Sequence, residues 1–164
     1  MFTLLVFPIV FLPMLIEARR AASNERAQRE RGGIEAQGDV YNAMRVAYPA
    51  AFLLMIAEGF LWGGAPIAVA TIGLLLFAAA KALKWWAILT LGKFWTFRVI
   101  VVPQAPLVTD GPYHFVRHPN YVAVIGELLS VALMTGARLS GPIAVVGFGL
   151  LIVLRIAIEE KALR

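Results

Sequence analysis

Long runs of apolar residues constrain the fold of this chain more than any other feature of its sequence. They cover residues 46–62, 67–83, 119–134 and 142–158, and a shorter run covers residues 2–16. A helix of roughly 20 apolar residues crosses the hydrocarbon core of a bilayer and satisfies its own backbone hydrogen bonds where lipid offers none. We therefore predict an all-α integral membrane protein, a single domain over residues 1–164 with five transmembrane helices.

The composition excludes several other classes of protein. Hydrophobic residues make up 60% of the chain and charged residues 15%, and the mean hydropathy is +0.79. A soluble helical bundle of this size has too small an interior to bury so much apolar surface. The chain has no cysteine, which rules out a disulfide framework, a thiolate metal site and a cysteine nucleophile.

The basic residues predict the orientation of the helices. With the amino terminus outside, every Lys and Arg except Arg138 falls on the cytoplasmic side or at its boundary, as the positive-inside rule requires. The same rule explains the net charge of +5 without a nucleic-acid partner. The carboxyl terminus is then cytoplasmic, and we expect the protein in a bacterial inner membrane with its site facing the cytoplasm.

Two polar segments lie on the predicted cytoplasmic side. Residues 17–41 are basic and are interpreted as a segment resting on anionic headgroups; a gate over a functional site is the alternative. Residues 84–118 form a connecting loop, within which residues 91–103 are expected to lie along the membrane surface. An interfacial anchor is predicted just before and at the start of this loop, made of Lys81, Lys84, Trp85 and Trp86.

The sequence LVTDGPYHFVRHPNY, residues 107–121, concentrates unusual polar and aromatic residues between apolar runs. Gly111 and Pro112 predict a turn, because glycine tolerates positive φ and proline presets its own φ. Pro119 suits the first position of a helix, where no backbone N–H is needed. A polar loop that leads directly into a membrane helix is a favourable place for chemistry.

A second polar cluster lies at the predicted cytoplasmic end of the last helix. Arg155 and Glu159 are four residues apart, so they share one face of that helix, and Glu160 follows them. Taken alone, this pair is equally well an ordinary salt bridge at a membrane boundary. His118 taken alone is equally well an interfacial residue that caps a helix, so neither motif decides the function by itself.

Together, the two motifs resemble the isoprenylcysteine carboxyl methyltransferase family of integral membrane enzymes. The family pattern is a G-P-Y…R-H-P-x-Y loop followed by an R-I-x-x-E-E-x-x-L helix end. The matching residues are Gly111, Pro112, Tyr113, Arg117, His118, Pro119 and Tyr121, then Arg155, Ile156, Glu159, Glu160 and Leu163. The resemblance covers about residues 91–164, with weaker similarity at residues 31–35.

The resemblance implies S-adenosylmethionine-dependent methyl transfer to a lipophilic small-molecule or lipidated acceptor. Members of the family build their cofactor site from the cytoplasmic ends of their last helices, without a Rossmann domain. The sequence agrees, because it has no G-x-G-x-x-G motif after a strand. We expect the bilayer as a partner, and neither a metal nor a nucleic acid.

The residue types suggest roles toward such a cofactor. Free N–H groups at the start of the helix suit the cofactor carboxylate, with charge-assisted bonds from Arg117 or His118. Glu159 suits the ribose diol or the ammonium group, because an ionised carboxylate only accepts hydrogen bonds. The residues expected to bind the cofactor are Gln104, Leu107, Val108, Gly111, Tyr113, Arg117, His118, Pro119, Tyr121 and Glu159.

Arg155 and Glu159 are the expected catalytic residues. Arg155 is the candidate for orienting an anionic acceptor oxygen toward the methyl group, and a less acidic hydroxyl would need His118 or Glu159 as a base. Trp95, Glu127 and Arg155 are expected to bind the acceptor. Glu127 lies inside a predicted span, where a carboxylate is a functional candidate; the alternative is a hydrogen-bonded glutamate packed between helices.

The acceptor and the reaction class leave alternatives open. Residues 91–103, 31–35 and the stretch after Arg117 resemble a bacterial branch of the family associated with O-methylation of alkylpyrones, which carry an acidic enol. The family name points instead to a prenylcysteine carboxylate. An NADPH-dependent membrane reductase of the sterol-reductase type is the alternative enzyme, since those proteins also carry an R-H-P-N-Y loop. A non-catalytic membrane protein is the remaining alternative.

Overall fold

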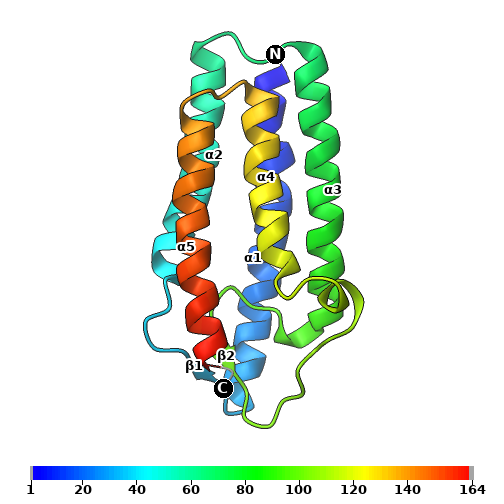
Figure 1. Cartoon of the computed structure of the whole chain (residues 1–164), viewed down its shortest axis with the longest axis vertical. Coiled ribbons are helices and arrows are strands. Elements are labelled where there is room, and N and C mark those ends of the chain that lie inside the picture. The colour runs from blue at the N-terminus through cyan, green and yellow to red at the C-terminus, as the bar shows by residue number, and fades with distance from the viewer. Residues whose placement is uncertain (1, 163–164) are drawn as a thin grey trace.

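The computed structural model describes residues 2–162, which fold into a bundle of five α-helices. These are α1 (Phe2–Glu30), α2 (Tyr41–Leu61), α3 (Ile67–Leu91), α4 (Pro119–Thr135) and α5 (Ser140–Ala162). They stand side by side, with the amino terminus at one end of the bundle and the carboxyl terminus at the other (Figure 1). We call the end that carries the carboxyl terminus the base. The all-α prediction is confirmed. Leu163, the last residue of the second motif, lies outside the described residues.

Three of these helices are long and apolar enough to cross a membrane, judged by length and composition. They are Tyr41–Leu61, Ile67–Phe94, which is α3 with the following turn, and Ser140–Ala162. The apolar helix α4 is shorter, and α1 is apolar only in its first half. Large apolar side chains such as Leu54, Leu75 and Leu150 are exposed on the outside of the bundle, as a lipid-facing surface requires. The count of five spans and their orientation stay predictions.

Small residues let the helices approach closely around α4. A Cβ on Gly73 of α3 would lie 2.8 Å from the backbone of Ser130 and Met134, and a Cβ on Gly59 of α2 would collide with Thr135. Close helix approach at glycine is a common packing mode in membranes. The fully buried core beside these contacts contains Phe52, Met55, Leu128 and Met134.

Helix α1 continues beyond residue 16, where the first apolar span was predicted to end and a separate basic segment to begin. The polar residues that follow do not form a separate surface segment; the same helix continues to Glu30 and turns one face inward. Glu17, Ala21 and Gln28 on that face are buried. The Asn24 amide donates hydrogen bonds to the carbonyl oxygens of Gly92 (3.0 Å) and Trp95 (2.7 Å). The polar half of α1 therefore supports the turn that follows α3.

Helix α3 is longer than predicted, and Lys84 does not have its predicted role as an interfacial anchor. It continues past the predicted end at residue 83 to Leu91, so the start of the predicted connecting loop is helical. Lys84 does not anchor at a headgroup surface, because its side chain is 3% exposed and points into ion pairs inside the bundle. Trp86 is about half exposed, as an interfacial residue would be.

The base is closed by a small sheet that the sequence did not predict. Strand β1 (Ile34–Glu35) pairs antiparallel with β2 (Ile100–Val101), in register Ile34 with Val101 and Glu35 with Ile100. Two short 3-10 turns, η1 (Gly92–Phe94) and η2 (Gly111–His114), complete the connection between α3 and α4. This connection folds back under the bundle (Figure 1).

Ion pairs tie this sheet to α1. Arg98 Nη1 and Arg29 Nη2 each lie 2.5 Å from the Glu35 carboxylate, and Arg98 Nε lies 3.8 Å from Glu25. These hydrogen bonds, first that from Arg29, hold the pKa of the Glu35 carboxyl below its ordinary value of 4.5. The Arg98 guanidinium has a correspondingly raised pKa, chiefly because of its hydrogen bond to Glu35.

Candidate active site

Two cavities hollow the lower half of the bundle. The first, which we call the bundle cavity, has a volume of about 350 Å³ and lies among α1, α2, α4 and α5. Its wall is largely apolar and includes Met14, Met44, Pro49, Val124 and Phe148. The second, which we call the loop cavity, has a volume of about 270 Å³ and lies between the 91–118 connection and the lower ends of α4 and α5.

The two cavities share one wall. Thr96, Asn120, Tyr121 and Arg155 line both of them. These residues come from three parts of the chain: the segment after η1, the first turn of α4 and the last turns of α5. Groups bound in the two cavities would therefore meet at these side chains.

Arg155 is the most highly connected side chain of this shared wall. It is 5% exposed. Its Nε donates to Tyr121 Oη (2.8 Å), its Nη1 to Asp39 Oδ1 (3.0 Å), and its Nη2 to the carbonyl oxygen of Phe97. Asp39 is held in turn by the backbone N–H groups of Tyr41 and Val99. A buried arginine paired and hydrogen-bonded in this way has a fixed orientation.

Tyr121 links Arg155 to Glu159. Its hydroxyl donates to Glu159 Oε2 over 2.9 Å while it accepts from Arg155 Nε. The His118 ring stacks on the Tyr121 ring with 5.6 Å between centroids, and His118 Nδ1 lies 3.9 Å from Glu159. The two sequence motifs, far apart in the chain, thus meet in one hydrogen-bonded row.

Most of the predicted cofactor-binding residues line the loop cavity. They are Leu107, Val108, Tyr113, Arg117, His118, Tyr121 and Glu159, together with Trp95 and Arg155, which were predicted to bind the acceptor. Burial raises the pKa of the Tyr113 phenol well above its ordinary value, with the Glu159 charge as a second cause, so this phenol stays neutral. Arg117 is 89% exposed and stands at the mouth of the cavity.

Three of the predicted cofactor-binding residues do not line either cavity. Gln104 is exposed and has a positive φ of 62°. Gly111 is structural: its φ is 57°, and a Cβ there would lie 2.6 Å from Thr90 Oγ1. Pro119 is buried at the first position of α4. Among the described residues no side chain caps that helix end. The N–H groups of Tyr121 and Val122 donate to the His118 carbonyl oxygen, which leaves the Asn120 N–H for a ligand.

Glu127 lies in a buried ion cluster and lines neither cavity. The cluster consists of Glu17, Lys81, Lys84 and Glu127, with Lys84 Nζ 2.9 Å from Glu17 and 3.2 Å from Glu127. Lys81 Nζ lies 2.7 Å from Glu17 and 3.1 Å from Glu127. The Tyr48 hydroxyl donates to Glu127 over 2.6 Å. The two carboxylates and two ammonium groups of the cluster sum to zero charge. Glu17, Lys84 and Tyr48 also line the bundle cavity, so the cluster borders that cavity.

Sequence reasoning missed several residues of the site. Asn120 follows Pro119 directly and accepts a 3.4 Å hydrogen bond from Trp95 Nε1. Its position inside the R-H-P-N-Y motif could have identified it as a site residue. Thr96 lies beside Trp95, which was singled out. Asp39 had no comparable signal, because nothing in its local sequence links it to Arg155.

The comparisons with known proteins agree with this geometry. The profile of the isoprenylcysteine carboxyl methyltransferase (ICMT) family matches residues 71–164, which include both motifs and most of the loop cavity. The uncharacterized protein YpbQ of Bacillus subtilis strain 168 is 31% identical over 168 aligned positions, covering all of this chain and 97% of the relative. An uncharacterized protein of Haemophilus influenzae is 25% identical, covering 85% of this chain and 82% of the relative.

No solved structure matches the chain significantly. The family match covers more than half of the chain, and the similarity to YpbQ extends over its full length. The residues that line the loop cavity lie within the segment matched by the family profile. The chain therefore belongs to the isoprenylcysteine carboxyl methyltransferase family and is a methyltransferase of the membrane.

Proposed function

We propose that this protein transfers a methyl group from S-adenosylmethionine to an oxygen atom of a lipophilic acceptor. The observation that carries the proposal is the shared wall of the two cavities. The loop cavity beside the base is lined by Arg117 and Glu159 and suits a charged, water-soluble cofactor, whereas the more apolar cavity among the helices suits an acceptor that arrives from the bilayer. Methyl transfer requires alignment of the two reactants, and a common wall provides it.

The chemistry of the loop cavity fits the cofactor. Leu107, Val108 and Trp95 offer apolar and aromatic contacts for an adenine ring. Glu159 can accept hydrogen bonds from a ribose diol or an ammonium group, and the uncapped start of α4 suits a carboxylate. When bound, S-adenosylmethionine supplies an electrophilic methyl group on a sulfonium.

Arg155 is proposed to hold the acceptor oxygen at the shared wall. A guanidinium has five N–H donors, and three of those of Arg155 already bind protein oxygen atoms. Arg155 Nη1 also contacts Met44 Sδ at 3.9 Å, so the second N–H of Nη2 is the donor that we assign to the acceptor. The acceptor classes that suit this arrangement are an alkylpyrone-like enol and a prenylcysteine-like carboxylate. The basic residues at the base favour a cytoplasmic site, in a bacterial inner membrane.

Calorimetric titration of the detergent-purified protein tests the cofactor. We expect binding of S-adenosylhomocysteine and none of NADPH; binding of NADPH alone would support the reductase instead. Glu159→Gln should weaken the binding of S-adenosylhomocysteine. Gln104→Gly is the matched control, because the Gln104 side chain is exposed outside the loop cavity and glycine tolerates its positive φ.

A further inference from the structure

The Tyr121 hydroxyl belongs to the wall that separates the two cavities. A phenol has one O–H donor and two lone pairs. The O–H donates to Glu159 Oε2 (2.9 Å), and one lone pair accepts from Arg155 Nε (2.8 Å). No described residue other than these two forms a hydrogen bond with Tyr121 Oη, so one lone pair is left for a ligand.

The charges next to this hydroxyl leave a surplus carboxylate. Arg155 is neutralised by Asp39 at 3.0 Å, and both side chains are buried. Glu159 is the remaining charged group in direct contact with the Tyr121 hydroxyl. S-adenosylmethionine carries one net positive charge, which offsets Glu159. A neutral acceptor therefore leaves the site balanced, whereas an anionic acceptor does not.

The other charged groups of the cavity walls do not change this balance. Glu17 and Lys84 belong to the neutral ion cluster. Glu25 pairs with Arg98 at the base. Arg45 and Arg117 are exposed, so water and salt screen their charges. A free lone pair beside a carboxylate repels another carboxylate but accepts a hydrogen bond from a hydroxyl group.

We propose that Tyr121 is a catalytic proton relay, and that the acceptor is an enolic or phenolic hydroxyl group bound in its protonated form. This inference rests on the proposed function. As the acceptor oxygen takes the methyl group, the methyl–sulfur electron pair stays on sulfur and the acceptor O–H bond breaks. The proton passes to Tyr121 Oη, and the original Tyr121 proton passes to Glu159 Oε2. Arg155 Nε stabilises the negative charge that develops on the phenol oxygen.

Glu159 can pass the proton on to water. Its side chain is 31% exposed, unlike the buried Arg155 and Asp39. His118 Nδ1 lies 3.9 Å away and offers a second exit. A carboxylate acceptor would need no relay, because it has no proton to lose.

Binding of a chromophoric probe to the protein without cofactor tests the relay. The probe is a 4-nitrophenol with a long alkyl chain, and its methyl ether is the matched ligand that cannot donate a hydrogen bond. The wild type should bind the phenol more tightly than the ether, and Tyr121→Phe should reduce that preference by roughly two- to tenfold, the value of one hydrogen bond. Tyr113→Phe is the control, because Tyr113 lines only the loop cavity. An unchanged preference in Tyr121→Phe would overturn the relay.

A second measurement uses the wild type alone and does not depend on the folding of a variant. Affinity for the nitrophenol should fall as the pH rises through the pKa of the probe itself, because only its protonated form donates to Tyr121. Equal or tighter binding of the coloured phenolate would contradict the proposal. Titration with S-adenosylhomocysteine distinguishes failure of the relay from failure of the proposed function. If S-adenosylhomocysteine binds but the preference for the phenol is absent, only the relay is wrong. If S-adenosylhomocysteine does not bind, the proposed function is wrong.

Discussion

Arg155 Nη1 lies 3.0 Å from Asp39 Oδ1, although the two residues are 116 positions apart in the sequence. The pair joins the segment before α2 to the last turns of α5 beneath the bundle cavity. Asp39 also accepts from the Val99 N–H over 2.9 Å, so one carboxylate fixes three parts of the chain. The site at the base is therefore held together by a residue outside both sequence motifs.

Asp39→Asn should damage both stability and turnover. It leaves the Arg155 charge buried without its partner, and breaking a buried pair costs about 3–5 kcal/mol of unfolding free energy. Thermal unfolding in detergent, followed by tryptophan fluorescence, measures the loss. Glu30→Gln, at the exposed end of α1, is the control and should unfold like the wild type. A wild-type melting temperature for Asp39→Asn would show that the pair does not stabilise the fold.

The ion cluster at Glu127 predicts a compensating pair of substitutions. Glu127→Gln leaves two buried lysines with one carboxylate and should cost about 3–5 kcal/mol. Adding Lys84→Met restores the charge balance, because Glu17 and Lys81 remain paired at 2.7 Å. The double variant should therefore be more stable than Glu127→Gln alone. If instead the two losses simply add in a double-mutant cycle, the residues are not coupled.

Gly111 predicts a local effect on the loop cavity. Its φ of 57° and the Thr90 hydroxyl 2.6 Å from the position of a Cβ both oppose a side chain there. Gly111→Ala should displace η2, which carries Tyr113, and cost about 1–3 kcal/mol, the usual range for a strained backbone. We expect weaker binding of S-adenosylhomocysteine by calorimetry. Gly147→Ala, where a Cβ meets nothing within 4 Å, is the matched control.

The sequence predicted the helices and the meeting of the two motifs well. Apolar runs identify helices because each must bury or face lipid along its length. Tyr121, Arg155 and Glu159 were singled out from motif spacing, and the structure places them in one hydrogen-bonded row. Leu107 and Val108, which carry no charge or unusual chemistry, were placed through the family resemblance and do line the loop cavity.

The polar face of α1 was not predictable in the same way. Glu17, Asn24 and Gln28 recur at helical spacing, but a hydropathy scale assigns polar residues to water. Their partners, Lys84, the Gly92 carbonyl and the Lys93 carbonyl, are distant in sequence. Only a tertiary structure shows that these groups satisfy one another inside the bundle. Asp39 and the strand pair at the base escaped prediction for the same reason.

The ion pairs of Glu35 lead us to predict that the small sheet at the lower end of the bundle is less stable in acid. Arg29 and Arg98 hold its folded-state pKa below 4.5, so its contribution to stability is complete above that pH and is lost as the pH falls through the lowered value. The protection factors of the β1 and β2 amides against hydrogen exchange, which take account of the slower intrinsic exchange in acid, should therefore fall as the pH is lowered. In Glu35→Gln the exchange should be faster at neutral pH, and its difference from the wild type should vanish well below pH 4.5. A difference that persists in acid would mean that Glu35 acts without its charge.

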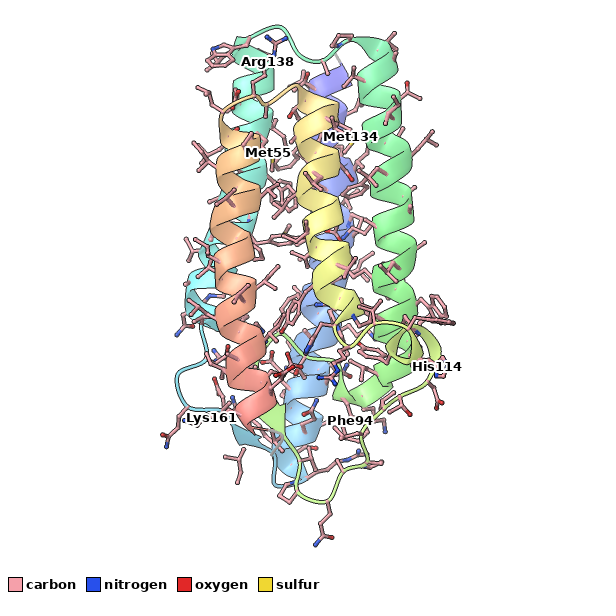
Figure 2. The ribbon with its side chains drawn as sticks, viewed as in Figure 1. Met55, Phe94, His114, Met134, Arg138 and Lys161 are labelled. Atoms are coloured by element: carbon pink, nitrogen blue, oxygen red, sulfur yellow. The ribbon has the colours of Figure 1, made fainter. Side chains whose placement is uncertain are left out.

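The orientation of the bundle can be measured with single cysteines, because the chain has none of its own. Arg138 and Gln37 are both exposed, and they lie near opposite ends of the bundle: Arg138 labels the end away from Lys161 in Figure 2, and Gln37 follows β1 at the base. The positive-inside rule predicts that Arg138→Cys reacts with a membrane-impermeant maleimide in intact bacteria. Gln37→Cys should react only after the membrane is permeabilised. The reverse pattern would place the base, with both cavities, outside the cytoplasm, where S-adenosylmethionine made in the cytoplasm would not reach the loop cavity.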